Sequence, residues 1–387
     1  MSVRKRKWTT SKGIVQEAWI VDYPDAQGAQ RTRRLKTFKR KKDADAFAAK
    51  TNVEVREGIH VADSASVTVR EAGKLWLTRA KADGLERATL MVYSQHVNHH
   101  IDPLIGLVKL SQLSIPRMRA FEDRLREEGR TPFLVHSVLR SLGAIIADAQ
   151  ERGLVAHNAV REMRARRRKS SSSARQKGKL KIGIDIPSPD EIRAILSHAT
   201  GRWRPLIVTA AFTGLRASEL RGLRWADVDL DAGELHVRQR ADRFNAIGKP
   251  KSASGERTVP FGKIVKNTLR EWKLACPKGE LDLVFPNGRG RVENLANIVR
   301  RGIIPTQIAA GVTVDGKAKY PGLHALRHFY ASWCINSEKD GGLALPPKEA
   351  QERLGHASIV MTLDRYGHLF PRGSNADLDK AEAALIA

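Results

Sequence analysis

The stretch LDRYGHLF, residues 363–370, lies near the C-terminal end of the 387-residue chain and contains its candidate nucleophile, Tyr366. Three motifs rich in basic residues precede it: TGLRASEL around Arg216, HALRH at 324–328, and LGHAS around His356. Guanidinium, imidazole and phenol groups together suit the cleavage of a phosphodiester without a metal ion. We therefore expect the rest of the chain to bring DNA to this tyrosine.

Arg216 and Arg327 are the candidate phosphate ligands. When a phosphodiester is cleaved, negative charge spreads over the non-bridging oxygens, and a guanidinium can donate to two of them while staying charged. Arg327 follows His324 by three residues, so a helix would turn both side chains to one face. Glu219 follows Arg216 by the same spacing and is expected to fix that guanidinium. The alternative for Glu219 is an ordinary surface pair of little energetic value.

The tyrosine hydroxyl needs a proton acceptor, because a pKa of about 10 makes it a poor nucleophile at neutral pH. His324 is the candidate acceptor and His356 the candidate donor to a phosphate oxygen, since histidine titrates near working pH. The departing 5′-oxygen needs a proton from a general acid. Lys249 and Lys251, in the loop at 248–252, are both candidates, and the residues alone do not choose between them.

The composition favours a polyanion as partner. The chain has 68 Lys and Arg residues against 42 Asp and Glu, a net charge of +26, and its 41% of hydrophobic residues is enough for several cores. Such a charge indicates nucleic acid in preference to a merely solvated basic surface. Two cysteines, Cys276 and Cys334, are too few for a disulfide framework and have no metal-ligand spacing. We expect neither a metal nor a cofactor.

No membrane or export segment is expected. The basic start MSVRKRKWTT is not followed by the apolar run of a signal peptide. The longest apolar stretch, around residues 206–215, is too short to span a bilayer. These features predict a cytoplasmic protein.

Residues 1–62 predict a small unit of strands and one helix. Residues 17–23 and 30–37 have strand composition on either side of a turn signal, and residues 41–57 have helical spacing. Basic residues are concentrated between 31 and 42, where contact with DNA is favoured over a solvated charged face. The candidate DNA-binding residues here are Arg31, Arg33, Arg34, Lys36, Lys39 and Arg40.

Residues 63–165 predict an all-helical unit with helices at 69–82, 88–100, 115–128 and 132–152. The following segment is basic, rich in serine and nearly free of large apolar residues, which predicts a flexible linker at 166–185. Within it, Arg166, Arg167, Arg168 and Lys169 are expected to lie along a DNA backbone. The alternative is a simple tether.

Residues 186–387 predict the largest unit. Ser188 and Glu191 have the spacing of a capping box for a helix at 189–199. Further helices are expected at 203–212, 216–223, 264–275, 294–309, 323–337, 347–354 and 358–366, strands at 234–240 and 257–260, and a weak amphipathic helix at 374–387. The predicted fold class is therefore mainly α with small β-sheets, an α+β chain.

The motifs TGLRASEL, HALRH, LGHAS and LDRYGHLF, in this order and at this spacing, resemble those of the tyrosine recombinases, specifically the phage-type, lambda-like integrases. The resemblance covers residues 186–372 closely, as a catalytic domain. Residues 63–165 are more loosely similar to the SAM-like core-binding domain of the family. Residues 1–62 resemble its arm-site DNA-binding domain.

The resemblance implies a role for each matching residue. Arg216 and Arg327 match the phosphate-binding arginines, Glu219 the adjacent acidic residue, His324 the histidine of the H-x-x-R motif, His356 a position held by His or Trp, Lys251 the hairpin lysine, and Tyr366 the nucleophile that forms a 3′-phosphotyrosyl bond. Lys249 remains an alternative to Lys251. His328, beside the H-x-x-R motif, is interpreted as structural.

The implied activity is site-specific DNA recombination, without metal or cofactor, that integrates or excises a phage or mobile element. The family implies double-stranded DNA at attachment sites as substrate and a homotetramer that passes through a Holliday junction. An excision factor and a host DNA-bending protein are further candidate partners, and the expected place is the cytoplasm of a bacterial host. The tail at 374–387 resembles a segment that docks on a neighbouring protomer, with packing on its own protomer as the alternative.

Three other interpretations compete with an integrase. A Xer-like resolving recombinase shares the chemistry, but such enzymes generally begin at the helical domain. A non-catalytic DNA-binding regulator derived from an integrase is disfavoured because every catalytic position is filled. A type IB topoisomerase is disfavoured by residues 1–62 and by the long basic linker.

Overall fold

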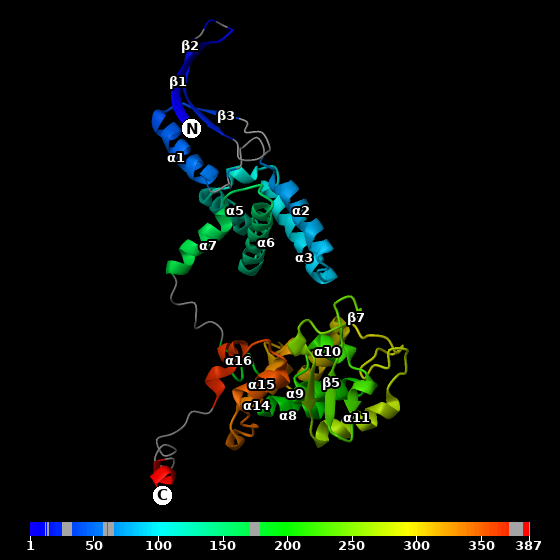
Figure 1. The fold of residues 1–387 in the computed structure, drawn as a ribbon. Coiled ribbons are helices and arrows are strands. Elements are labelled where there is room, and N and C mark those ends of the chain that lie inside the picture. Colours follow the sequence, from blue (N-terminus) through cyan, green and yellow to red (C-terminus); the bar gives the residue numbers. More distant parts are fainter. Residues whose placement is uncertain are drawn as a thin grey trace. The chain divides into compact units, whose positions relative to one another are not determined.

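The computed structural model describes residues 1–11, 13, 15–24, 33–56, 60, 66–170, 179–370 and 382–386. The chain forms two compact units, Met1–Ser173 and Ala174–Ala387 (Figure 1). Both units are mainly helical and contain small antiparallel sheets, which confirms the predicted α+β class.

The N-terminal part of the first unit is a three-stranded antiparallel sheet with one helix packed on it (Figure 1). Its elements are β1 Ser2–Thr9, β2 Val15–Pro24, β3 Arg33–Phe38 and α1 Lys41–Arg56, with β2 in the centre. Val21, Tyr23 and Ala44 form the core of this part. The sequence did not predict β1, because half of its eight residues are charged, most are exposed, and they show no apolar alternation. A continuous backbone ladder to β2 holds this strand in place.

The rest of the first unit is helical. Its helices are α2 Val69–Ala82, α3 Arg87–His96, α4 Asp102–Ile105, α5 Ile115–Glu127, α6 Pro132–Glu151 and α7 Ala159–Ser170. They enclose one core that includes Trp76, Phe121 and Leu142. The predicted helix at 88–100 is interrupted, because α3 passes at Val97–Ile101 through a π-helical turn, which is wider than an α-helical turn.

Helix α7 differs from the prediction. The sequence placed residues 166–170 in a linker, whereas the structure has them in α7, together with the basic run Arg166–Lys169. Val160 and Met163 are buried in the helical core. Two apolar side chains one turn apart thus anchor a helix whose later residues are charged. Residues 171–178 lie outside the described part of the chain.

Helix α6 is the one helix in the described part of the chain whose length and composition would allow a membrane span. Of its apolar window, 56% is buried inside the helical unit. Val138, Leu142 and Ile145, among others, belong to the core there. Such burial is typical of the central helix of a folded domain.

The second unit has one large core surrounded by helices. Its helices are α8 Pro189–His198, α9 Trp203–Thr213, α10 Ala217–Gly222, α11 Lys263–Ala275, α12 Leu295–Asn297, α13 Ile304–Ala309, α14 His324–Ile335, α15 Pro347–Leu354 and α16 Ile359–Tyr366. Ser188 and Glu191 form the predicted capping box at the start of α8. The predicted helix at 294–309 is split, because a π-helical segment at Ile298–Ile303 joins α12 to α13. Of the predicted tail helix, residues 382–386 are described and are helical.

Short strands complete the second unit. They are β4 Val228–Asp229, β5 Glu234–Val237, β6 Arg240–Ala241, β7 Ile247–Gly248, β8 Arg257–Pro260, β9 Thr313–Val314 and β10 Lys317–Ala318. Strands β4, β5 and β8 form one antiparallel sheet, and β6 pairs with β7. The predicted strand at 234–240 is therefore divided between two sheets. The loop with the candidate lysines joins β7 to β8.

Candidate active site

The turn between α9 and α10 positions the first arginine of the site. Gly214 ends α9 in the left-handed conformation, with φ at 59°. A Cβ at Gly214 would lie 2.2 Å from the ring of Tyr330, so backbone and packing both require glycine. Arg216 is then the N-cap of α10, and its backbone N–H donates to the carboxylate of Glu219 at 2.9 Å. The TGLRASEL motif is thus a helix end, a turn and a helix start.

Glu219 lies between two guanidinium groups. Its carboxylate accepts hydrogen bonds from Arg216 Nη1 at 2.7 Å and from Arg257 at 2.9 and 3.2 Å. Glu219 is only 3% exposed. Burial alone would raise the pKa of Glu219, but the charges of Arg257 and Arg216 outweigh burial and lower this pKa to about 2. Glu219 is therefore a buried, ionised and doubly paired carboxylate, unlike the surface pair considered as its alternative.

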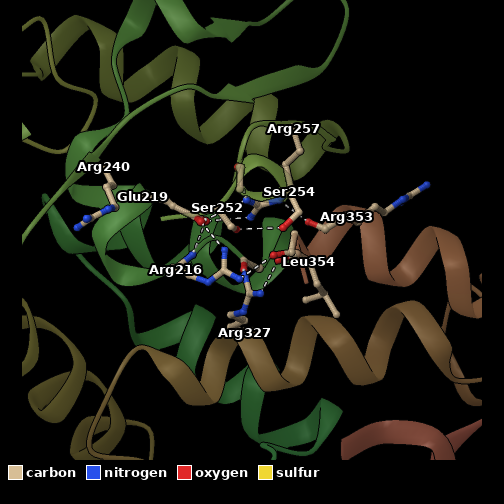
Figure 2. Close-up of polar contacts among 12 residues, drawn as sticks. Arg216, Glu219, Arg240, Ser252, Ser254, Arg257, Arg327, Arg353 and Leu354 are labelled. Atoms are coloured by element: carbon tan, nitrogen blue, oxygen red, sulfur yellow. Dashed lines mark hydrogen bonds and ion pairs between the residues drawn. The ribbon is translucent and has the colours of Figure 1, made fainter. Parts of the chain in front are cut away.

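Three consecutive carbonyl groups at the end of α15 accept hydrogen bonds from three different arginines (Figure 2). The carbonyl of Arg353 accepts from Arg257 Nε at 2.8 Å, that of Leu354 from Arg327 Nη2 at 2.5 Å, and that of Gly355 from Arg216 Nη2 at 2.8 Å. The last carbonyls of a helix lack intrahelical partners and carry partial negative charge, so cations are stabilised there. We call Arg216, Arg257, Arg327, Glu219 and the carbonyls of residues 353–355 the arginine frame.

Gly355 allows the arginine frame to close. It caps α15 in the left-handed conformation, with φ at 62°. A Cβ at this position would lie 2.8 Å from Arg257 Nη1 and 2.9 Å from the carbonyl oxygen of Ser254. The glycine of the LGHAS motif therefore lets Arg257 and the loop before β8 approach the end of α15.

Arg327 is the most deeply buried arginine of the frame, with 3% of its surface exposed. From α14 its Nη1 donates to the carbonyl of Gly214 at 2.7 Å, while its Nη2 reaches Leu354. Burial and the nearby charge of Arg216 lower the pKa of Arg327 to about 9. The guanidinium is still charged at neutral pH, and it joins the turn after α9 to the end of α15.

His356 follows the frame directly and is 7% exposed. Its Nδ1 lies 2.9 Å from the hydroxyl oxygen of Thr362 on α16. Burial, together with Arg327 and Arg216, lowers the pKa of His356 to about 3, so the ring is neutral at neutral pH. If the threonine hydroxyl donates to Nδ1, the proton of the neutral ring is on Nε2, which can donate in turn. The same contact ties the tyrosine helix to the arginine frame.

Tyr366 is the last residue of α16 and is 2% exposed. Its hydroxyl oxygen lies 2.5 Å from Nδ1 of His328. Burial raises the pKa of Tyr366 to about 12, although the charges of Arg327 and Arg365 act in the opposite direction. The structure thus pairs the hydroxyl with the histidine that the sequence interpreted as structural. His324, the histidine expected to accept the proton of the tyrosine, lies one turn earlier in α14 and is exposed. Its ring meets the ring of His328 edge-on, with 4.5 Å between the ring centroids.

The candidate lysines lie in the loop between β7 and β8, and both are exposed. The carbonyl of Lys249 accepts a hydrogen bond from Arg240 Nε at 3.1 Å, beside the β6–β7 pair. Lys251 directly precedes the segment 252–255, which packs against Gly355 and whose last carbonyl accepts from Arg257 at 3.0 Å. Lys251 is therefore next in sequence to the part of the loop that contacts the arginine frame.

The predicted DNA-binding residues of the sheet fall on both of its faces. Residues directly opposite on neighbouring strands share a face. Lys36 is opposite Val21 on the face covered by α1, and its ammonium lies 4.5 Å from the ring centroid of Phe47. Arg33 is on the other face, is exposed and pairs with Asp22 at 3.1 Å.

The remaining predicted DNA-binding residues are placed as follows. Arg34 faces the same side as Lys36, and Lys39 and Arg40 are exposed just before α1. Arg31 lies outside the described residues, as do the side chains of Arg166, Arg167, Arg168 and Lys169, although their backbone is helical. The sequence did not select Arg4 and Arg6, which are exposed on the face of the sheet turned away from α1.

Two residues of the site were missed as functional candidates. Arg257 was treated only as the start of the strand RTVP, and its charge was not considered as a signal. His328 follows Arg327 and lies one helical turn after His324, so the spacing alone would have placed it near the same site. Neither signal identifies the partner, because Glu219 and Tyr366 come from distant parts of the sequence.

Residues 188–372 match the family model described as the Phage integrase family. Over 363 residues the chain is 26% identical to a protein named tyrosine recombinase XerC-like from Caldanaerobacter subterraneus subsp. tengcongensis, a match that covers 86% of this chain and 87% of the relative. It is 35% identical over 168 residues to tyrosine recombinase XerC of Xylella fastidiosa, but spans only 49% of that relative and 43% of its own length.

Solved structures show the same fold. The integrase of transposon Tn1549, solved with circular intermediate DNA, has a TM-score of 0.63 and 19% identity, covering 83% of this chain and all of the other. The lambda integrase tetramer bound to a Holliday junction has a TM-score of 0.55 and 18% identity, covering 91% of this chain and 95% of the other. Residues 188–372 therefore carry a Phage integrase family domain, and the relatives support a tyrosine recombinase of the phage-integrase type, an enzyme that cleaves and rejoins DNA strands.

Proposed function

We propose that this recombinase integrates and excises a phage or other mobile element, and that Tyr366 forms a 3′-phosphotyrosyl bond with the cleaved strand. The observation that carries the proposal is the arginine frame, which gathers three of the four motifs around the end of α15. The fourth motif is tied to it, because Thr362 of α16 contacts His356 one turn before Tyr366. The phosphotyrosyl link conserves the energy of the broken bond, so rejoining needs no nucleotide.

Arg216 and Arg327 are proposed to hold the scissile phosphate. Each Nη atom carries two hydrogens, and the backbone carbonyls that accept one of them fix the planes of both guanidinium groups. Donors that are already oriented stabilise the transition state without reorganisation. Nε2 of His356, and the exposed His324 at the start of α14, are proposed as further donors to the same phosphate.

Lys251 is proposed as the general acid that protonates the departing 5′-oxygen. Its place next to segment 252–255, which contacts Gly355, supports this choice over Lys249. An exposed lysine at a loop tip can move toward the bound strand. Replacement of the 5′-oxygen by sulfur in the substrate removes the need for an acid, so it should rescue a Lys251 variant and not an arginine variant.

The three domains that the sequence predicted are retained as a proposal, with residues 1–62 contacting arm sites and residues 63–165 contacting the core site. The basic outer face of the sheet supports the first assignment, because Arg4, Arg6 and Arg33 are exposed on one side. Each Arg or Lys that contacts a phosphate makes binding more dependent on salt, so removal of such a charge makes binding less dependent on salt. Arg4→Gln with Arg6→Gln should therefore reduce the salt dependence of arm-site binding and leave cleavage at a core site unchanged.

The assembly proposed is a homotetramer on two attachment sites that passes through a Holliday junction, in the cytoplasm of a bacterial host. A solved lambda integrase is a tetramer bound to a Holliday junction, which supports this proposal. An excision factor and a host DNA-bending protein are proposed as accessory partners. A Xer-like resolving recombinase is the second candidate, favoured by the XerC relatives. The sheet and α1 at the N-terminus favour the integrase.

The test is covalent capture on nicked duplexes made from the DNA that flanks the gene. The wild-type chain should form an adduct with the strand that carries the 3′-phosphate, and Tyr366→Phe should bind the same duplex and form none. Tyr93→Phe, a tyrosine of the helical unit, is the matched control and should form the adduct normally. An adduct formed by Tyr366→Phe would overturn the proposal.

A further inference from the structure

The hydroxyl of Tyr366 and the ring of His328 are in direct contact, at 2.5 Å between the oxygen and Nδ1. The two residues come from different helices, since His328 is on α14 and Tyr366 ends α16. Their ring centroids are 5.9 Å apart. The contact leaves the tyrosine 2% exposed, so the hydroxyl has a defined partner before any substrate is present.

The surroundings of His328 keep its imidazole uncharged. Burial lowers the pKa of His328 to about 4, and the charges of His324, Arg365 and Arg327 act in the same direction, while Asp185 opposes them. A neutral imidazole has one bare nitrogen, and a phenol donates readily to it. At neutral pH the tyrosine is therefore the donor and Nδ1 of His328 the acceptor.

The position of His328 also couples the nucleophile to the phosphate. It follows Arg327 directly in α14, and Arg327 is fixed at both Nη atoms by the carbonyls of Gly214 and Leu354. One rigid helix thus presents a phosphate ligand and the partner of the nucleophile on consecutive residues. His324 touches the His328 ring and not the tyrosine hydroxyl, which leaves it on the outer side of the pair.

We propose that His328, and not His324, accepts the phenolic proton of Tyr366 during strand cleavage and returns it during rejoining, an inference that rests on the proposed function. In the forward step the Tyr366 oxygen forms a bond to phosphorus while the bond from phosphorus to the 5′-oxygen breaks. The phenolic proton moves to Nδ1 of His328, and the 5′-oxygen takes a proton from the general acid, proposed above as Lys251. Rejoining reverses each of these transfers.

Two substitutions separate proton acceptance from positioning. His328→Ala removes both functions, whereas in His328→Asn the amide oxygen can accept the tyrosine hydrogen bond but cannot take up its proton. Single-turnover cleavage of the nicked duplex should fall by about 10²- to 10⁴-fold in both variants, the usual contribution of a general base. His198→Gln, on the exposed end of α8, is the matched control and should cleave at the wild-type rate.

The pH dependence of cleavage gives a signature that a structural role would not produce. Between pH 6 and pH 9 the wild-type rate should not depend on the charge of His328, since this ring is already neutral there. Without the base, attack requires the tyrosinate, so the variant rates should rise about tenfold per pH unit below the pKa of Tyr366. Fluorinated tyrosine at position 366, which has a lower pKa, should then accelerate His328→Asn far more than the wild type.

The results that overturn the inference differ from those that overturn the proposed function. Wild-type rates in His328→Asn, or variant rates without pH dependence, would show that His328 does not accept the proton. Adducts from Tyr366→Phe would instead remove the nucleophile itself. His328→Ala could disrupt α14, which thermal unfolding and DNA binding would reveal. In that case His328→Asn with fluorinated tyrosine at position 366 still tests whether His328 accepts the proton. A 5′-thio substrate should rescue Lys251→Ala and leave both His328 variants slow.

Discussion

The candidate active site has a proposed phosphate side and a proposed nucleophile side, and the two are held in very different ways. On the phosphate side, the arginine frame fixes three guanidinium groups by one buried carboxylate and a run of helix-end carbonyls. On the nucleophile side, the Tyr366 hydroxyl has a hydrogen bond to one neutral histidine, and α16 is tied to the frame through Thr362. The phosphate side is therefore organised before DNA binds, whereas Tyr366 is buried and has to give up its proton as it attacks.

This difference suggests how cleavage is controlled. Preorganised charge lowers the barrier only when the nucleophile reaches the phosphate. A tyrosine that is 2% exposed and has a pKa of about 12 is inert by itself. The arginine frame can thus be permanently assembled without random strand breakage, since Tyr366 stays buried and protonated until its proton is transferred.

The largest expected effect is on the centre of the frame. Glu219→Gln removes the charge that pairs with Arg216 and Arg257 and should lower the free energy of unfolding at pH 7 by about 3–5 kcal/mol, the usual result of removing one partner of a buried pair. Denaturant unfolding measures this change, with Glu271→Gln, at an exposed residue of α11, as the matched control. A loss of stability as small as that of the control would contradict the idea of a firmly fixed phosphate side, because the frame would then not depend on its carboxylate.

The same carboxylate should make stability depend on acid. Its pKa is lowered from 4.5 to about 2 on folding, so its contribution is complete above about pH 4.5 and is lost as the pH falls toward 2. In wild type, the free energy of unfolding should decrease over this window by more than in Glu219→Gln. Equal acid sensitivity of the two proteins would show that Glu219 is not strongly paired.

The next effect concerns catalysis. Arg216→Lys keeps the charge but cannot reach both Glu219 and the carbonyl of Gly355, so cleavage should fall by about 10²- to 10³-fold while DNA binding is retained. Single-turnover cleavage and a binding titration on one duplex measure the two properties separately. Arg193→Lys, on the exposed face of α8, is the control. Near-normal cleavage would mean that charge suffices and oriented donors do not matter.

A smaller effect is expected where the frame closes. Gly355→Ala places a side chain on a left-handed residue and against Arg257, which should cost about 1–3 kcal/mol in stability and also slow cleavage. Gly262→Ala is the control, since its backbone is extended and a Cβ there would meet no neighbour within 4 Å. If both variants unfold alike, close packing at the end of α15 is not required.

The smallest effect is expected on the nucleophile side, at the contact between Thr362 and His356. Thr362→Val removes the hydroxyl that forms a hydrogen bond with His356, which should lower the free energy of unfolding by about 1 kcal/mol at most. Cleavage should become slower, because the change loosens α16 and leaves the arginines in place. Thr313→Val, in the short strand β9, serves as control. A stability loss as large as that of Glu219→Gln would contradict the division of the site into a fixed and a lightly held half.

The sequence predicted most of the helices of both units, because their apolar spacing and capping residues are local signals. It did not predict β1, because four of its eight residues are charged and its long-range pairing with β2 is not visible in the sequence. It also predicted no helix after residue 152 in this unit, whereas Val160 and Met163 anchor α7 by contacts that only the folded core reveals.

At the site, the motifs identified Arg216, Glu219, Arg327, His356 and Tyr366, and the structure brings these residues together around α15 and α16. The sequence could not give the partners. Arg257 reaches Glu219 across 38 residues, and His328 reaches Tyr366 across the same separation. The choice between His324 and His328 depends on which side of α14 faces α16, and that follows from packing and not from spacing.

The most direct test of the account is to identify the residue that becomes attached to DNA. Adducts formed by the wild-type chain on the nicked duplex, with a metal chelator in excess, would be digested with protease and nuclease and mapped by mass spectrometry. We predict a nucleotide 3′-phosphate linked to Tyr366 in the peptide that contains LDRYGHLF. Attachment to any other residue, or an adduct that forms only when divalent metal is restored, would contradict it.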